Sequence, residues 1–238
     1  MNVITKDNYK LFTYSNDEIC EFPVKGIVLE FHGLGGGNEI IKVHSDFAML
    51  CANKGIIYLI PYYGPWSWMN DIAINTVDEI LEAVWDRFSL DESVPIISTG
   101  GSMGGLSALI YTRYAKRKVS ACAANCPVCD LIFHYTERED LPRTIYHAFS
   151  HYECGFESAI KSGSPVEQVE YMPDIPYFIA HCTNDTAVSK TLHSDVFVKK
   201  MLETGKNITY EIVQNRGHCD LDAQGWSRYR NFIFENCR

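Results

Sequence analysis

The chain has 238 residues, of which 46% are hydrophobic and 21% charged, and its formal net charge is −9 at pH 7. These fractions are typical of a globular protein with one substantial core, and the acidic balance argues against nucleic acid or an anionic membrane as the main partner. Because no run of about 18 apolar residues occurs, we expect no membrane span. The first residues lack a charged-then-apolar signal pattern, so we expect a cytoplasmic protein.

Short apolar runs alternate with longer helical stretches along most of the chain. The apolar runs predict buried strands at 26–31, 56–60, 94–98, 119–124, 176–181 and 208–213. The stretches between them predict helices at 46–54, 71–88, 106–118, 189–203 and 222–235. The polar and aromatic segment 9–22 is expected to form antiparallel edge strands. This alternation predicts an α/β fold with a mostly parallel central sheet and helices on both faces.

The segment 127–173 interrupts the alternation and is rich in aromatic and histidine side chains. A connection of this length between two strands is uncommon unless it is functional. We expect a small helical cap over the carboxyl edge of the sheet, with a structural excursion that makes no substrate contact as the alternative. No internal repeat or low-complexity linker occurs, so we expect residues 1–238 to form one domain.

Residues 100–104 read Gly-Gly-Ser-Met-Gly, a G-x-S-x-G pattern between an expected strand and an expected helix. Strand, sharp turn and helix are the context of a nucleophile elbow, in which a strained turn exposes the serine hydroxyl. Small residues must flank such a turn, and Gly100, Gly104 and Gly105 meet this need. The pattern predicts that Ser102 is a nucleophile.

A serine nucleophile needs a base to take its proton and an acid to orient that base, and on this kind of sheet the chain order is serine, acid, histidine. Of the eight histidines, His218 in the turn after the last expected strand is the predicted base. Asp185, in the loop after the preceding expected strand, is the predicted acid, with Asp130 as its rival. Asp222 lies close to His218 in sequence but better suits a helix N-cap.

Acyl transfer places negative charge on the former carbonyl oxygen, which fixed backbone N–H groups stabilise in an oxyanion hole. One predicted donor is the amide of Met103, the residue after the nucleophile. The second is expected from the glycine-rich loop 32–37, with the amide of Leu34 as first choice and that of Gly35 as the alternative. The loop matches neither G-x-x-x-x-G-K-[ST] nor G-x-G-x-x-G, so nucleotide binding is the weaker interpretation.

The nine cysteines are odd in number and scattered, which predicts free thiols. Cys126 and Cys129 form a C-x-x-C pair, only half of a four-ligand zinc site, and we expect neither a metal nor an organic cofactor. Tyr63, Trp66 and Trp68 follow a central strand and are expected to bind substrate, with ordinary packing as the alternative.

The chain resembles the α/β-hydrolase superfamily over most of its length, because the His-Gly loop, the elbow, the acid loop and the terminal Gly-His occur in that superfamily's order. The part from 164 to 218 resembles the catalytic domain of the prolyl oligopeptidase family, whose acid motif H-G-x-x-D-x-x-V reads H-C-x-x-D-x-x-V at 181–188. Cys182 departs from the family glycine. Oligopeptidases carry a large β-propeller before this domain, and nothing in this chain could form one. The resemblance therefore implies a stand-alone esterase more than a peptidase.

We therefore expect a serine hydrolase that cleaves a carboxylic ester of modest size through an acyl-enzyme, using Ser102, Asp185 and His218. A small peptidase or amidase is the alternative on the same fold, and a non-catalytic binding protein is the least favoured. The expected partner is a small-molecule ester, and a homo-oligomer stays open.

Overall fold

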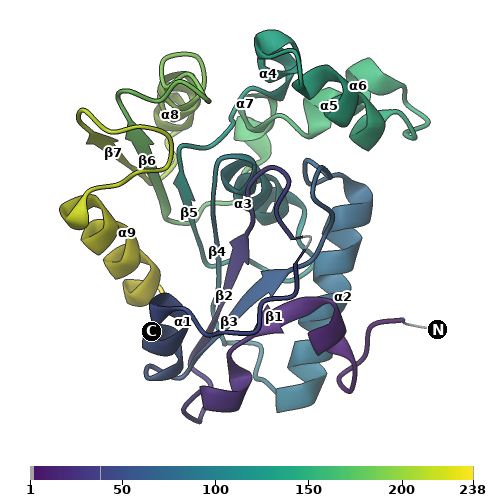
Figure 1. The fold of residues 1–238 in the computed structure, drawn as a ribbon, viewed down its shortest axis with the longest axis vertical. Helices are drawn as coiled ribbons and strands as arrows, with labels where there is room; N and C mark the ends of the chain where they lie inside the picture. The colour runs from purple at the N-terminus through teal and green to yellow at the C-terminus, as the bar shows by residue number, and fades with distance from the viewer. Residues whose placement is uncertain (1–2, 38, 238) are drawn as a thin grey trace.

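The computed structural model describes residues 3–37 and 39–237, and seven of its strands form one sheet in the order β1-β3-β2-β4-β5-β6-β7 (Figure 1). The strands are β1 (Thr13–Ser15), β2 (Gly26–Phe31), β3 (Ile56–Pro61), β4 (Ile96–Gly101), β5 (Ala121–Asn125), β6 (Tyr177–Cys182) and β7 (Ile208–Val213). The short β1 runs antiparallel to β3, and the other neighbouring strands are parallel. The predicted α/β fold with a mostly parallel sheet is confirmed.

Parallel strands need crossover connections, which helices supply. The α-helices are α1 (Asp46–Ala52), α2 (Asp71–Phe88), α3 (Met103–Tyr114), α4 (Leu131–Glu137), α5 (Leu141–Phe149), α6 (Phe156–Ser162), α7 (Pro165–Gln168), α8 (Ser194–Glu203) and α9 (Ala223–Glu235). Three short 3-10 helices are η1 (Tyr9–Leu11), η2 (Asp17–Ile19) and η3 (Val169–Tyr171). In the described part of the chain, no helix has both the length and the apolar character that crossing a bilayer requires.

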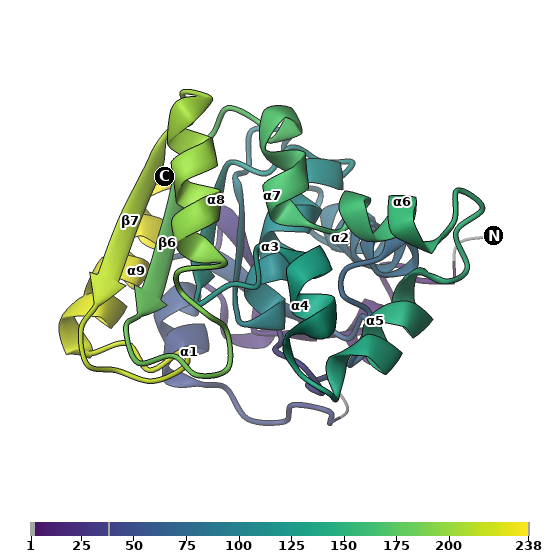
Figure 2. The ribbon, with the colours of Figure 1, turned by 90° about the horizontal axis from the view of Figure 1, so that it is seen from above.

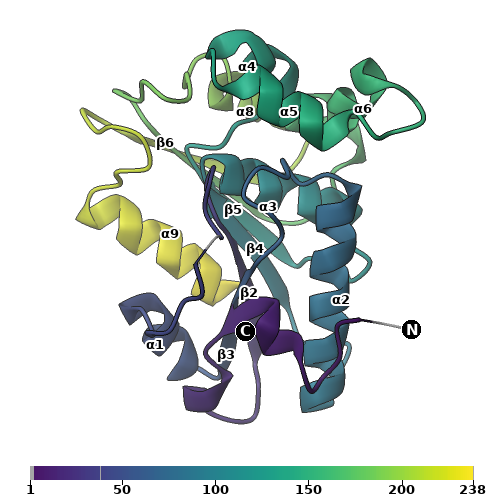
Figure 3. The same cartoon turned by 45° about the vertical axis from the view of Figure 1, so that its right-hand side comes forward.

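Two hydrophobic clusters cover opposite faces of the sheet. Because successive side chains of a strand point to opposite faces, Leu29 and Phe31 of β2 join the cluster with α2, α3 and α8, whereas Val28 joins the cluster with α1 and α9. Figure 1 shows α2 and α9 on opposite sides of the sheet, and Figure 3 shows α1 and α9 on the same side.

The N-terminal segment departs in part from the antiparallel edge strands expected there. It forms one short antiparallel edge strand, β1, between the 3-10 helices η1 and η2. The buried Asn16 explains the difference, because its side chain donates to the carbonyls of Ala48 and Ile56 and accepts the N–H of Tyr58. The Asn16 side chain thus pairs with backbone groups of β3 beyond the end of β1.

Helix α8 begins at Ser194, five residues after the predicted start at Ser189. Tertiary hydrogen bonds hold the intervening residues in turns. The N–H of Ser189 donates to Glu137, and the ring of His193 accepts backbone N–H groups from the segment after β5. Helical periodicity alone does not reveal such competing partners.

Helices α4 to α7 occupy the interruption predicted at 127–173. Figure 1 shows α4, α5 and α6 beyond the carboxyl ends of the strands, and Figure 2 shows them beside α2 and α3 in the view from above. The loop before α2 anchors them, because Trp68 Nε1 donates to Thr144 Oγ1 at 3.1 Å and Asn70 Nδ2 donates to the Ala148 carbonyl at 2.9 Å. We call residues 127–173 the cap.

Candidate active site

Ser102 lies in the sharp turn between β4 and α3, with φ 60° and ψ −125°. A non-glycine residue in such a conformation is strained by about 1–3 kcal/mol and needs neighbours that enforce it. Its own N–H donates to the Asn125 carbonyl at 2.9 Å, and its carbonyl accepts the N–H groups of Gly105 and Leu106 at 3.0 and 3.2 Å. The backbone on both sides of the strained residue is therefore fixed.

The glycines of the elbow are required because backbone atoms fill the space where side chains would project. A Cβ on Gly104 would overlap the Phe31 carbonyl oxygen, and one on Gly100 would lie 2.5 Å from the Gly104 carbonyl oxygen. Across the turn, a Cβ on Gly33 would lie 4.0 Å from Ser102 Cβ. The elbow and the loop after β2 therefore lie against each other.

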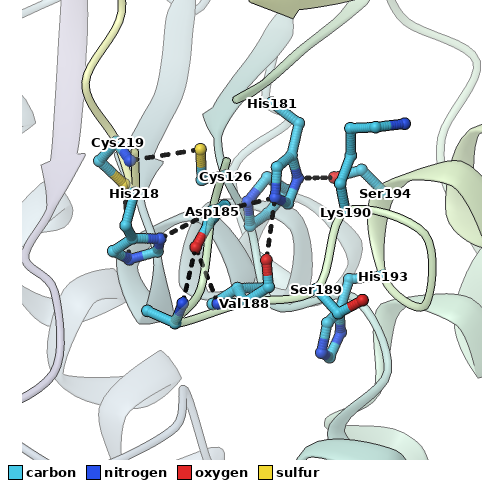
Figure 4. Close-up of polar contacts among 12 residues, drawn as sticks. Cys126, His181, Asp185, Val188, Ser189, Lys190, His193, Ser194, His218 and Cys219 are labelled. Atoms are coloured by element: carbon cyan, nitrogen blue, oxygen red, sulfur yellow. Dashed lines mark hydrogen bonds and ion pairs between the residues drawn. The ribbon is translucent and has the colours of Figure 1, made fainter. Parts of the chain in front are cut away.

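Asp185 and His218 form a hydrogen-bonded pair, with Oδ2 and Nδ1 2.7 Å apart (Figure 4). The other carboxylate oxygen of Asp185 accepts the N–H groups of Ala187 and Val188, each at 2.9 Å. Burial opposes ionisation of Asp185, but hydrogen bonds from His181 and His218 outweigh it and hold the pKa of Asp185 well below its ordinary value. The carboxylate can therefore stay charged at neutral pH and orient the His218 ring.

The sequence analysis assigned no role to His181, which it placed at the end of a strand and at the start of the acid motif. It is fully buried, its Nε2 lies 3.2 Å from Asp185 Oδ2, and its Nδ1 lies 2.6 Å from Ser194 Oγ. Figure 4 shows Asp185 between His181 and His218. The spacing of four residues between His181 and Asp185, across the end of a strand, was the available signal.

The pKa of His218 is raised above its ordinary value. Burial lowers that pKa, but the hydrogen bond to Asp185 and the contact with Cys126 outweigh burial and raise it to about 9. An imidazole accepts a proton only in its neutral form. The ring therefore becomes available as a base as the pH rises above neutrality.

Ser102 and His218 line a cleft of about 840 Å³ whose wall includes the loop after β2 and helix α9. This volume falls within the range of small-molecule sites. Apolar side chains make up much of its lining, namely Leu34, Ile41, Val43, Phe47, Ile60, Trp226 and Ile233. Of the described cap residues, one, Arg138, lines the cleft, so the alternative of a mainly structural cap gains support.

The half-buried Glu30 brings a carboxyl group to this apolar cleft. It follows Val28 by two positions in β2 and therefore points to the same face. Burial raises the pKa of Glu30, whereas the hydroxyl that Tyr58 donates to it and the charge of Arg230 act in the opposite direction. A charged residue inside the apolar run 26–31 was the signal that the sequence analysis passed over.

The backbone amides expected to act as oxyanion donors differ in the acceptors they already have. Met103 opens α3, so its N–H has no acceptor within the helix. The N–H of Gly35 donates to the Pro65 carbonyl at 2.8 Å. Leu34 lines the cleft, whereas Gly35 does not occur among the described residues of its lining.

Residues 70–233, more than half of the chain, match the model of the prolyl oligopeptidase family, peptidase family S9. The chain belongs to the prolyl oligopeptidase family. It is therefore a member of a family of serine hydrolases, and the resemblance seen in its motifs is confirmed. No curated protein matches the sequence.

Solved structures of both peptidases and esterases share the α/β-hydrolase fold of this family member. A puromycin-hydrolysing peptidase of Mycobacterium tuberculosis is 17% identical with a TM-score of 0.68, and the match covers 83% of this chain and 31% of that one. Esterase B of Lactobacillus rhamnosis is 12% identical with a TM-score of 0.69, covering 92% and 78% of the two chains. Esterase PE8 is 16% identical with a TM-score of 0.61, covering 89% and 93%. The chain thus spans about a third of the peptidase.

The rival carboxylates of this S9 family member cap helices. Asp130 Oδ1 accepts the N–H of Phe133 at the start of α4, at 2.9 Å. Asp222 Oδ1 accepts the N–H of Gly225 at the start of α9, at 2.7 Å. Each side chain satisfies a backbone donor that the helix itself leaves unpaired, and Asp185 is the carboxylate that contacts His218.

The aromatic residues expected to bind substrate pack elsewhere in this family member. Trp68 is fully buried beneath the cap, and the Tyr63 hydroxyl donates to the His32 carbonyl at 3.1 Å while the Tyr63 ring stacks on that of His32. Trp66 is half exposed. Among the described residues that line the cleft, none of the three occurs. Tyr63 and Trp68 thus fit the packing alternative, and the apolar wall includes Leu34, the segment 41–47 and α9.

Proposed function

We propose that the protein is a serine esterase that cleaves a carboxylic ester of modest size, with Ser102 as nucleophile, His218 as base and Asp185 as its orienting acid. The observation that carries the proposal is the 2.7 Å contact between Asp185 and His218 at a cleft that Ser102 also lines. The strained turn at Ser102 is the second support.

In the proposed reaction, His218 Nε2 takes the proton of Ser102 Oγ as that oxygen attacks the ester carbonyl carbon. The bond from this carbon to the alkoxy oxygen then breaks, and His218 returns the proton to the leaving alcohol. Water adds to the acyl-enzyme by the same steps, releasing the carboxylic acid and regenerating the Ser102 hydroxyl. No step calls for a metal or an organic cofactor.

The amides of Met103 and Leu34 are proposed to donate to the oxyanion that forms in each tetrahedral intermediate. An N–H group at the start of a helix is unpaired and carries the positive end of the helix dipole. Losing one such donor costs about 3–4 kcal/mol of transition-state stabilisation in related chemistry.

The ester is supported by two structural neighbours whose names are esterases, esterase PE8 and esterase B. The second candidate, a small peptidase or amidase, is favoured by one observation, the carboxyl of Glu30 in the cleft. A carboxylate there offers a partner for the ammonium group of an aminoacyl substrate.

The test is a panel of p-nitrophenyl esters and aminoacyl p-nitroanilides, with Ser102→Ala as the matched control. The proposal expects ester turnover that Ser102→Ala abolishes. Anilide turnover equal to ester turnover, also lost in Ser102→Ala, would establish the second candidate. Neither turnover nor labelling by a fluorophosphonate would leave a non-catalytic binding protein and refute both.

We also propose a small-molecule ester as the partner and the cytoplasm as the location. The nine cysteines include thiols at Cys126 and Cys219, and a reducing compartment keeps such thiols reduced. Cell fractionation checks the location, and recovery of the protein outside the cytoplasm would contradict it.

A further inference from the structure

Two thiols lie beside the His218 ring. Cys219 Sγ is 3.7 Å from His218 Nε2, and one ligand atom each from Cys126, His218 and Cys219 all lie within 4.8 Å of one another. Cys219 lines the cleft next to His218, whereas Cys126 is buried directly after β5. Figure 4 shows both thiols next to the His218 ring.

The spacing of these atoms suits a tetrahedral zinc ion. Zinc lies about 2.3 Å from sulfur and about 2.0–2.1 Å from nitrogen, which places neighbouring ligand atoms roughly 3.5–3.8 Å apart. The sulfur-to-nitrogen distance between Cys219 and His218 already has this value. Cys126 Sγ lies within 4.8 Å of Cys219 Sγ and of a ring nitrogen of His218, so a shift of about 1 Å brings the two sulfur atoms to the distance that a shared zinc ion requires.

The surroundings hold the three side chains in place. Cys126 and Cys219 have φ values of 44° and 56°, an uncommon conformation for non-glycine residues. The N–H of Cys219 donates to Cys126 Sγ at 3.3 Å, and the Asn125 side chain donates to the Cys219 carbonyl at 3.2 Å. The pairing of His218 Nδ1 with Asp185 leaves Nε2 for a metal, the arrangement that orients zinc-binding histidines in many proteins.

A second group of metal-ligating side chains, His134, Glu137 and His193 in the cap region, fails this test. The Nδ1 atom of His193 accepts the backbone N–H groups of Cys129 and Asp130 at 3.2 and 3.1 Å. Neutral His193 therefore carries its proton on Nε2 and donates it to Glu137. With no lone pair at Nε2 to offer a metal, His193 belongs to a hydrogen-bond network around Glu137.

We propose that Cys126, Cys219 and His218 Nε2 form a Zn²⁺ site that switches the hydrolase off. Binding forms two zinc–sulfur bonds and one zinc–nitrogen bond, and the protons of the two thiols and of a charged His218 ring go to the solvent. The charge of the ion is balanced by the two thiolates. Water from the cleft takes the fourth position. With its Nε2 lone pair bound to the metal, His218 cannot accept the proton of Ser102.

Metal binding is tested without any reference to turnover. Metal-free protein, kept reduced with a phosphine because dithiothreitol competes for zinc, is titrated with Co²⁺. We expect one equivalent to produce a thiolate-to-cobalt charge-transfer absorption band that Zn²⁺ then removes. Cys126→Ser and Cys219→Ser should each lose the band, and Cys154→Ser, which removes an exposed thiol outside the site, should keep it.

The absence of the band from the native protein, or its persistence in both Cys126→Ser and Cys219→Ser, would overturn the site. Thermal melting of each variant shows whether it is folded. Cys126 is buried, so if Cys126→Ser does not fold, the less buried Cys219→Ser decides the question.

The switch itself rests on the proposed function and is tested by ester hydrolysis. One equivalent of Zn²⁺ should lower the native rate at least about tenfold, with recovery after chelation. In Cys126→Ser, the Zn²⁺ concentration that halves the rate should rise by more than roughly 10–100-fold. That range is the loss of metal affinity expected when a residue that only supports a ligand is removed, and Cys126 is proposed to bind the metal directly. A cobalt band without inhibition of ester hydrolysis by Zn²⁺ would overturn the switch but keep the metal site. A native protein without ester turnover would refute the proposed function, and the cobalt titration would still test the metal site.

Discussion

Replacing Ser102 by glycine should stabilise the protein, whereas replacing it by alanine should not. Both changes remove the nucleophilic hydroxyl, so they differ only in the Cβ atom. At φ 60° and ψ −125° that Cβ is what strains the backbone. Alanine keeps this strain and glycine relieves it.

The size of the difference follows from two opposing effects. A strained residue of this kind costs about 1–3 kcal/mol in the folded state. Glycine gives the unfolded chain more freedom, which takes back about 0.4–1 kcal/mol. The glycine variant should therefore be more stable than the alanine variant by about 0.5–2 kcal/mol, or roughly 1–8 °C in Tm for a chain of this size.

Thermal and urea unfolding of the two variants measure the difference, and an ester assay should find that both have lost at least about 10⁴-fold in turnover. Ser107, which is buried in the regular part of α3, provides the matched control. There the order should reverse, with glycine less stable than alanine by about 1 kcal/mol. If Ser102→Gly is no more stable than Ser102→Ala, the strained-elbow reasoning is refuted.

Three further predictions concern the base, the cap and the elbow. Protonated His218 cannot act as a base, so kcat/KM for an ester should rise with pH, with a midpoint at the His218 pKa of about 9. Asp185→Asn should move this rise in kcat/KM to lower pH and cut the rate about 10⁴-fold. A native protein whose kcat/KM rises with a midpoint near pH 6.5 would contradict the reasoning. Glu137→Gln should lower the free energy of unfolding by about 3 kcal/mol at pH 7. Burial raises the pKa of Glu137, but hydrogen bonds from two histidines outweigh burial and lower that pKa to about 2. The stabilisation by Glu137 is therefore present above pH ~4.5 and fades as the pH falls towards 2. Equal urea midpoints for Glu137→Gln and the native protein at pH 7 would refute this prediction. Gly104→Ala should destabilise by about 3 kcal/mol or more, since its Cβ would meet the Phe31 carbonyl. Gly217→Ala, where the space is open, should melt like the native protein, and similar melting of both variants would count against the packing argument.

The parts of the fold that the sequence predicts are those with strong local signals. Helix α2 begins at Asp71 and ends at Phe88 as expected, because its apolar face is regular and Asn70 caps its first turn. The juxtaposition of Asp185 and His218 was predictable for another reason. Parallel strands end at one edge of a sheet, so residues in the loops after β6 and β7 meet there.

The parts that could not be predicted depend on what surrounds a residue. Strand alternation shows that Glu30 faces away from Leu29 and Phe31, but it does not show that α1 and α9 leave a cleft on that side. Tyr63 and Trp68 carry the same aromatic signal whether they bind a ligand or pack in a core. The structure assigns them to packing through partners far away in the sequence, such as Thr144 in the cap.

The departure from the family glycine at Cys182 raised the question of whether a larger side chain displaces the acid loop. Cys182 is fully buried at the end of β6, and the loop still closes through the N–H of Thr183, which donates to the Val213 carbonyl at 2.9 Å. Burial and the neighbouring thiol of Cys126 raise the pKa of Cys182 to about 12, so it stays neutral beside Asp185. Because β5 and β6 are adjacent, the extra side chain fills space next to Cys126 and leaves Asp185 within 2.7 Å of His218. Cys182→Gly should therefore leave the pH dependence of ester hydrolysis unchanged and lower stability through the cavity it opens, and a shifted pH profile would show that Cys182 positions the acid.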